Sequence, residues 1–347
     1  MNASPNGVVI GYGFAGEFFH SYLIQLDSGI RLHGIASRDA ETRARIVAER
    51  RCKAYQRFEQ VISDPDVDLV VLATPNSTHA DLAVRAMDAG KHVVTDKVMC
   101  TALADCDRMI EASKRNGVLL TVFQNRRWDG DFLTLRKLLE EGRLGDLRWL
   151  EMAWQTFGAW GGWRGEKAMG GGKFFDLGAH MVDQAMLLFP QAVETVYCRM
   201  HHDHAECDVE SHAMLVIGFA GGATVVLDTS GVNAIPKPRI HASGTQGAYI
   251  IHGLDPQEAA MIAGDIDDAV EPEERYGRFS DGKEQEFVPT INGRWRSYYE
   301  NIAAVLTCGA EPNLTLPQVR RCMQVFDAAL QSAATGVVMR PEIPALE

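Results

Sequence analysis

The amino-acid sequence predicts an α/β protein in which a doubly wound parallel sheet is followed by an α+β domain with a large open, mainly antiparallel sheet. Three observations lead to this fold class. Apolar strands alternate with helical patterns up to Gln124, strands dominate further along the chain, and short turns such as Ala220-Gly221-Gly222 join some of the later strands. In this chain of 347 residues we therefore expect two domains, 1–124 and 125–347.

The first region repeats a strand, a helix and a strand at a spacing that is typical of a parallel sheet with right-handed crossovers. Its strands are expected at 7–11, 31–36, 68–73, 92–95 and 118–123. Its helices are expected at 15–28, 39–52, 77–90 and 101–116. The run from Leu69 to Ala73 is continuously apolar, which indicates a strand that is buried on both faces.

The second region begins with an expected helix at 129–142 and a long strand at 147–156, followed by a Gly/Trp-rich loop at 158–172 and a helix at 173–188. Further strands are expected at 193–201, 209–219, 222–231, 237–243 and 246–251. The acidic stretch 265–286 is expected to be a surface excursion, and two helices, at 294–308 and 316–335, close the chain.

The first strand breaks into the pattern G-x-G-x-x-G at Gly11, Gly13 and Gly16. The first glycine allows a sharp turn, the second lets a phosphate approach the backbone, and the third lets the next helix pack closely. Free N–H groups at the helix start, around Phe14 and Ala15, would then face a diphosphate. The pattern predicts a Rossmann-type dinucleotide site, and a tight turn without a ligand is the alternative.

The end of the second strand indicates which dinucleotide is preferred. NAD-binding domains usually place a carboxylate at the strand tip, whereas this chain has Ser37 and Arg38 there, followed by Asp39. The side chains of Ser37 and Arg38 can both donate hydrogen bonds to a 2′-phosphate. We therefore favour NADP over NAD. The alternative is that Asp39 caps the following helix and that Arg38 is solvated.

Two further strands of the first domain end in polar residues. In a doubly wound sheet these ends face the ligand, so we expect cofactor contacts there and at the domain junction. The residues concerned are Thr74, Pro75, Asn76, His79, Asp96, Lys97 and Asn125. Lys97 could also stabilise an alkoxide as a substrate hydroxyl loses its proton. A plain capped turn at 74–79 and a solvated lysine are the alternatives.

The glycine-rich segment 170–183 provides the main signal of the second domain. Asp176, His180 and Asp183 would share one face of a helix. The positive end of the helix dipole favours a neutral imidazole at His180, and a neutral imidazole can act as a base. The alternative is a structural aspartate with a partly buried histidine.

Two other polar clusters are less specific. Arg126 and Arg127 could orient hydroxyls or a carboxylate, or could form salt bridges between the domains. The tract from His201 to His204, with Cys207 and Asp208, has no regular ligand spacing, so we expect no metal site.

Together, the G-x-G-x-x-G turn, the T-P-x-x-x-H loop, the lysine and the pattern G-G-G-x-x-x-D-x-G-x-H-x-x-D resemble the family of glucose–fructose oxidoreductase, inositol dehydrogenase and the rhizopine-catabolism protein (Gfo/Idh/MocA). The segment from Asn125 to Asp129 is similar to the inositol-dehydrogenase-like branch. The resemblance implies that Lys97, Asp176 and His180 are catalytic. It also places Arg127 on the substrate side. We expect Trp163, in the Gly/Trp-rich loop, and Asp176 and His180 to contact the substrate as well.

What the resemblance implies is reversible hydride transfer between NAD(P) and a secondary alcohol of a cyclic polyol or sugar, with a homodimer or homotetramer formed through the C-terminal sheet. A redox-assisted, NAD-dependent glycosidase and a non-catalytic NAD(P)-binding regulator are the alternatives. The family usually has proline after the lysine, whereas this chain has Val98. Either a trans bond aims Lys97 differently, or the bond is cis.

Composition limits the classes of function. The net charge of −12, without a basic stripe, argues against nucleic-acid binding. No apolar run is long enough to span a membrane. The N-terminus lacks the features of a signal peptide and the seven cysteines are scattered, so we expect a cytoplasmic protein with reduced thiols.

Overall fold

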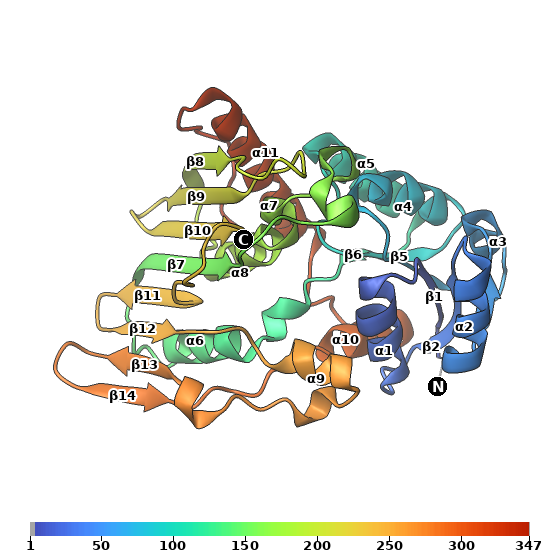
Figure 1. The fold of residues 1–347 in the computed structure, drawn as a ribbon, viewed down its shortest axis with the longest axis horizontal. Helices are drawn as coiled ribbons and strands as arrows, with labels where there is room; N and C mark the ends of the chain where they lie inside the picture. Colours follow the sequence, from blue (N-terminus) through green and yellow to red (C-terminus); the bar gives the residue numbers. More distant parts are fainter. Residues whose placement is uncertain (1–3, 347) are drawn as a thin grey trace. The chain divides into compact units, whose positions relative to one another are not determined.

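The computed structural model describes residues 4–346, which form two compact units (Figure 1). The first unit runs to Gln124 and resumes over Trp295–Val319, and the second comprises Asn125–Arg294 and the chain from Arg320 onward. A break therefore falls at the expected position between 124 and 125. The segment 295–319, which we expected in the second domain, groups with the first unit instead.

The first unit contains a six-stranded sheet in the order β3-β2-β1-β4-β5-β6. Every neighbouring pair is parallel, which confirms the predicted doubly wound sheet. The strands are β1 (Asn6–Ile10), β2 (Arg31–Ala36), β3 (Lys53–Tyr55), β4 (Leu69–Leu72), β5 (His92–Thr95) and β6 (Leu120–Val122). Strand β3 was not predicted, because three residues with only one buried side chain leave no apolar run.

Helical segments connect these strands. They are the turns at Ala15–His20, which continue into α1 (Ser21–Gln25), then α2 (Ala40–Arg50), α3 (Phe58–Ile62), the short turn Asn76–Thr78, α4 (His79–Asp88) and α5 (Leu103–Asn116). Helix α10 (Ser297–Cys308) belongs to the same unit because aromatic side chains anchor it there. Trp295 is fully buried and its ring stacks on Phe19, with ring centroids 5.5 Å apart.

The second unit contains an eight-stranded sheet in the order β14-β13-β12-β11-β7-β10-β9-β8. Only β7 and β10 pair in parallel, so the predicted, mainly antiparallel sheet is confirmed. The strands are β7 (Leu147–Gln155), β8 (Val193–His201), β9 (His212–Phe219), β10 (Thr224–Ser230), β11 (Ile240–Gly244), β12 (Ala248–Ile251), β13 (Gly277–Ser280) and β14 (Gln285–Val288). The last two strands lie in and just beyond the acidic stretch expected to be a surface excursion. Their four-residue length and exposed polar residues hid them from a search for apolar runs.

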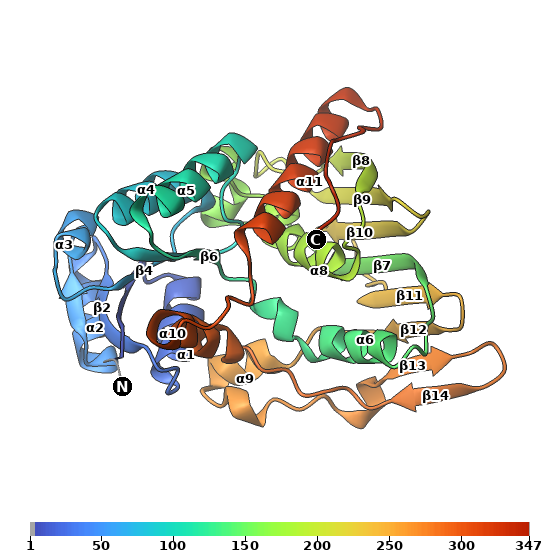
Figure 2. The same cartoon turned by 180° about the vertical axis from the view of Figure 1, so that it is seen from behind.

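The helices of this unit are α6 (Gly130–Glu140), α7 (Lys173–Asp176), α8 (Gly178–Leu188), α9 (Gln257–Ala263) and most of α11 (Leu316–Thr335). Short helical turns occupy Asn125–Trp128, Gly162–Gly165, Lys167–Met169, Ile266–Asp268 and Glu273–Arg275. Helix α8 packs across β7 and β10 (Figure 2) and is buried along almost its whole length. In the described part of the chain, no helix is long and apolar enough to cross a membrane.

Candidate active site

Of the three glycines in the turn after β1, two have no room for a side chain and the third faces open space. Gly11 has φ 98°, and a Cβ there would lie 2.4 Å from the carbonyl oxygen of Ala73. A Cβ on Gly16 would lie 2.2 Å from the carbonyl oxygen of Gly11. Gly13 has no atom within 4 Å of the position that its Cβ would take. This open backbone at a helix start fits the diphosphate of a dinucleotide.

The tip of β2 presents a cation and not a carboxylate. Asp39 caps α2, because its carboxylate accepts the Thr42 N–H at 2.7 Å, and these hydrogen bonds lower its pKa. Arg43 donates to the carbonyl oxygens of Ser37 and Arg38 at 2.9 and 2.8 Å and so holds the turn. The Arg38 side chain is exposed. Both parts of the alternative are therefore seen, since Asp39 caps α2 and Arg38 is exposed, and contact of Arg38 with a cofactor stays a prediction.

His79 ties together the two loops that follow β4 and β5. Its imidazole is fully buried, with Nδ1 3.0 Å from the Val98 carbonyl oxygen and Nε2 2.9 Å from that of Thr74. Burial outweighs these hydrogen bonds and the charge of Asp96 and lowers the pKa of His79. Both ring nitrogens face backbone carbonyls, so His79 shapes the loops from within, and its direct contact with a cofactor stays a prediction.

Lys97 follows β5, and the Lys97–Val98 peptide bond is cis. The Lys97 N–H donates to Asp96 Oδ1 at 2.8 Å. Burial disfavours the charged carboxylate of Asp96, but His20, Lys97 and His79 more than offset it and lower the pKa of Asp96 to about 2. An ionised Asp96 therefore stands directly beside Lys97. Our sequence reasoning missed His20, because a histidine within an apolar helical pattern gives no signal of its own.

In the second unit, Asp176 ends α7 and His180 is the third residue of α8. Arg164 Nε lies 3.2 Å from Asp176 Oδ2, and the Arg164 guanidinium also lies over the Trp163 ring, 4.9 Å from its centroid. The predicted Trp163, in the Gly/Trp-rich loop, is thus linked to the predicted Asp176 through one arginine. His180 is almost fully buried near the N-terminal end of α8.

Arg127 forms a buried ion pair with Asp183 of α8, one helical turn beyond His180. Its Nε and Nη2 lie 2.7 Å from the two carboxylate oxygens, and the side chains are 6% and 2% exposed. This bidentate geometry braces the start of the second unit against α8. The predicted role of Arg127 in substrate binding therefore stays a prediction. Asn125, predicted as a cofactor contact, is buried, and its side-chain nitrogen has no hydrogen-bond partner in the described part of the chain.

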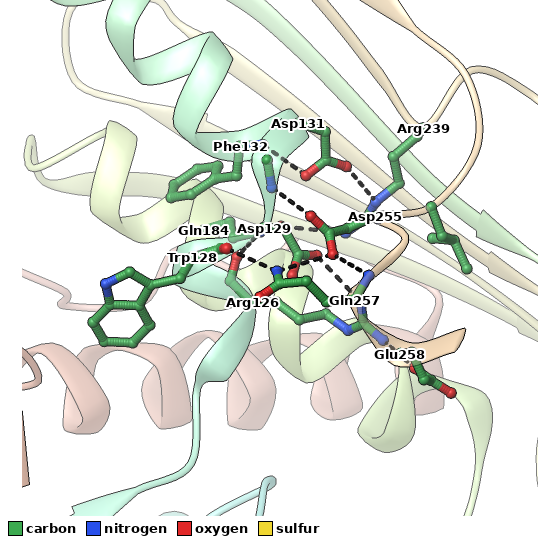
Figure 3. A network of polar contacts seen from close by, with 12 residues as sticks. Arg126, Trp128, Asp129, Asp131, Phe132, Gln184, Arg239, Asp255, Gln257 and Glu258 are labelled. Carbon is green, nitrogen blue, oxygen red and sulfur yellow. Dashed lines mark hydrogen bonds and ion pairs between the residues drawn. The ribbon is translucent and has the colours of Figure 1, made fainter. Parts of the chain in front are cut away.

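A second, larger ionic network surrounds Arg126 (Figure 3). Arg126 Nη1 lies 3.2 Å from Asp129 and its Nη2 lies 2.6 Å from Glu258 of α9. Arg239 Nε lies 3.4 Å from Asp131. Gln184, on α8, links the two halves because it donates to the Arg126 carbonyl and accepts from Arg239. Burial raises the pKa of Asp131, although Arg239 opposes it.

The network reaches His180 through one aromatic ring. The guanidinium carbons of Arg126 and Arg239 lie 4.2 and 5.1 Å from the centroid of the Trp154 ring. Trp154 in turn stacks with His180, at a centroid distance of 6.0 Å and an interplanar angle of 26°. These contacts hold the imidazole plane from the side of β7.

The histidine tract begins with His201, the last residue of β8. The rings of His201 and His212 stack at 5.5 Å, and His212 Nε2 lies 3.1 Å from Asp228. Among residues 4–346, no three or more His, Cys, Asp or Glu side chains are grouped as a metal ion would require.

Comparisons with known proteins agree with this geometry. Residues 6–124 match the model of an oxidoreductase family with an NAD-binding Rossmann fold, and residues 132–250 match that of the GFO/IDH/MocA C-terminal domain. The chain is 29% identical to scyllo-inositol 2-dehydrogenase (NADP(+)) IolW of Bacillus subtilis (strain 168), covering 94% of this chain and 92% of that protein. It is 33% identical to the oxidoreductase YdgJ of Escherichia coli (strain K12), covering 94% and 95%.

A solved oxidoreductase structure, yvaA from Bacillus subtilis, superposes with a TM-score of 0.90 at 26% identity, covering 97% of this chain and 98% of that one. An oxidoreductase from Klebsiella pneumoniae superposes with a TM-score of 0.87 at 31% identity, covering 98% and 96%. The first family model lies in the first unit and the second lies in the second unit, and each of the two solved structures covers nearly the whole chain. The chain belongs to the Gfo/Idh/MocA family of NAD(P)-binding oxidoreductases.

Proposed function

We propose that this protein transfers a hydride between a nicotinamide cofactor and a secondary alcohol or ketone of a cyclic polyol or sugar. The proposal depends on two observations in a chain that belongs to an oxidoreductase family. Lys97 stands beside an ionised Asp96, and Asp176 and His180 lie where α7 ends and α8 begins. A relative of matching length is named as a scyllo-inositol dehydrogenase, which supports the substrate class.

In this proposal the cofactor supplies the hydride acceptor, and the protein supplies positioning and proton transfer. His180 removes the hydroxyl proton as a neutral base. Lys97 donates a hydrogen bond to the same oxygen and stabilises its developing negative charge. Asp176, oriented by Arg164, accepts a hydrogen bond from a neighbouring hydroxyl and so fixes which carbon presents its hydrogen.

NADP is the proposed cofactor. The support is that Asp39 is engaged as a helix cap while Arg38 is exposed at the strand tip, and that IolW is named as NADP-dependent. Arg38→Ala should reduce the preference for NADP over NAD, measured as the ratio of kcat/KM values, by about ten- to hundredfold, as expected for lost charge-assisted hydrogen bonds. Arg115→Ala, which removes an exposed arginine from the end of α5, is the control. An unchanged ratio in Arg38→Ala would exclude this role.

The direct test of function is a spectrophotometric screen of inositols, pyranoses and their keto forms with both cofactors. With the best substrate, His180→Ala should lower kcat about 10²–10⁴-fold, the usual contribution of a general base, with cofactor affinity nearly unchanged. His252→Ala, which removes an exposed histidine beyond β12, is the control.

The alternatives predict different results in the same screen. A glycosidase that oxidises its substrate transiently would keep its cofactor through purification and release sugar without net reduction. A regulator would bind cofactor and turn over nothing, and Lys97→Ala would then change no measurable rate. Either outcome would exclude the dehydrogenase.

We also propose that the C-terminal sheet pairs with a second copy of the chain. Along the register of β8, β9 and β10, the half-buried side chains of Tyr197, Val216 and Val226 stand side by side, and Trp149 is 40% exposed on β7. Val216→Asp should convert a dimer or tetramer to a smaller species in light scattering. A wild-type monomer would contradict this proposal.

A further inference from the structure

A buried histidine that the chemistry proposed above does not use faces Asp96, the residue that follows β5. His20 lies one turn beyond the glycine motif and is 0% exposed. Its Nδ1 is 2.7 Å from the hydroxyl oxygen of Tyr299, which is also fully buried and belongs to α10. Its ring packs on Phe123, with centroids 4.5 Å apart. The three side chains come from distant parts of the sequence but from one compact unit.

The other ring nitrogen faces a carboxylate. His20 Nε2 lies 3.8 Å from Asp96 Oδ2 and has no hydrogen-bond partner in the described part of the chain. At that distance the pair is an electrostatic contact and not a hydrogen bond. The second oxygen of Asp96 accepts the backbone N–H of Lys97 at 2.8 Å. One short path therefore leads from Tyr299 through His20 and Asp96 to the backbone of Lys97.

The neighbouring groups favour one position for the proton. His20 is fully buried, and a bare lone pair on Nε2 would be repelled by the facing carboxylate of Asp96, so we infer that Nε2 carries a proton. Tyr299 then either donates to a neutral Nδ1 or accepts from a protonated one. In both cases the hydroxyl fixes the ring so that an N–H group points toward Asp96.

We propose that His20 is a positioning residue, which holds Asp96 and through it the Lys97 segment, and that Tyr299 fixes the orientation of His20. This inference rests on the proposed role of Lys97. The low pKa of Asp96 is consistent with it, since His20 is the largest of the influences that oppose burial. The proposed role of Tyr299 also gives a functional reason why residues 295–319 group with the first unit, because α10 supplies the Tyr299 hydroxyl.

Tyr299→Phe tests the path with the loss of one oxygen atom. We expect kcat to fall about two- to tenfold, the rate equivalent of one ordinary hydrogen bond, while the NADPH dissociation constant is unchanged. His20→Leu should lower kcat by on the order of ten- to hundredfold, and His20→Gln, which keeps an N–H near the position of Nε2, should restore part of the loss.

The matched control is Tyr55→Phe, which breaks a comparable hydrogen bond to Asp64 in the same unit. If Tyr55→Phe and Tyr299→Phe lower thermal stability alike and neither alters kcat, the role of Tyr299 is structural and the proposal is overturned. Equal losses of kcat in His20→Leu and His20→Gln would likewise overturn the role of the N–H group.

A second readout does not depend on turnover. Nitrogen-15 NMR of selectively labelled histidine should show His20 with a proton on Nε2 in the wild-type protein, and a changed Nδ1 signal in Tyr299→Phe. A bare Nε2 would overturn the proposal even in an active enzyme. A protonated Nε2 in a protein that oxidises no polyol would instead refute the proposed function and leave the contact between His20 and Asp96 established.

Discussion

Arg127→Met should destabilise the second unit strongly, because it leaves the Asp183 carboxylate buried without its partner. Asp183 is 2% exposed, and two contacts of 2.7 Å are lost. Removing one member of a buried ion pair typically costs about 3–5 kcal/mol. Since a unit of this size loses about 2–4 °C in melting temperature per kcal/mol, we expect a fall of roughly 10 °C.

The assay is urea unfolding followed by tryptophan fluorescence, alongside calorimetry. Arg148→Met is the control, because Arg148 and Asp146 form an exposed pair of the same type in the same unit, with side chains 52% and 76% exposed. It should cost about 0–1 kcal/mol. The double variant Arg127→Met/Asp183→Leu should recover part of the lost stability, because no unpaired charge then remains buried.

A change in unfolding free energy below about 1 kcal/mol for Arg127→Met would refute this reasoning. The same variant also bears on the predicted substrate role of Arg127. A selective rise in the substrate KM, with unfolding free energy unchanged, would show that the guanidinium serves the substrate and not the fold.

Two further predictions concern the cofactor turn and the buried carboxyls. Gly13→Ala should leave the free energy of unfolding nearly unchanged but weaken NADPH binding at least about tenfold in fluorescence titration, because the new Cβ would enter the space where a phosphate would lie. Gly161→Ala, which also adds a Cβ in open space, is the control. Equal NADPH affinities of the two variants would contradict a diphosphate site at this turn. Burial raises the pKa of Glu271 to about 7, against the opposing charge of Arg275. Over this range the folded state holds the Glu271 proton more tightly than the unfolded chain does. The free energy of unfolding should therefore decline as pH rises from about 4.5 to 7. Glu271→Gln should abolish that decline in urea unfolding measured across this pH range, and an identical slope in both proteins would contradict the assignment.

The sequence identifies those parts of the site that depend on local patterns. Gly11, Gly13 and Gly16 indicate a strand, a turn and a helix, and the structure has this order. Asp176 and His180 were expected on one helix, whereas a break at Leu177 puts them in α7 and α8, and their shared role stays a prediction. That the first sheet is parallel and doubly wound follows from the alternation of strands and helices together with the handedness of crossovers, whereas its strand order and strand β3 were not predicted.

The parts that could not be predicted depend on contacts between distant residues. Tyr299 reaches His20 across 279 positions, and nothing in the pattern of α10 indicates that it returns to the first unit. Arg127 was interpreted as a substrate ligand or as part of a salt bridge between the domains, because sequence spacing cannot show that its guanidinium forms an ion pair with Asp183. For the peptide bond between Lys97 and Val98, the sequence left the cis and trans forms as alternatives because the family proline is missing, and the structure has the cis form.

The central claim is that the hydrogen leaves a carbinol carbon and reaches the cofactor directly. The measurement is proton NMR of the reduced cofactor after incubation of NADP with scyllo-inositol, or with the best substrate of the screen, deuterated at its ring carbons. The proposal predicts deuterium on one face of nicotinamide C4, and no label there in His180→Ala over the same time. Reduced cofactor without deuterium, or substrate cleavage with no reduced cofactor, would contradict it.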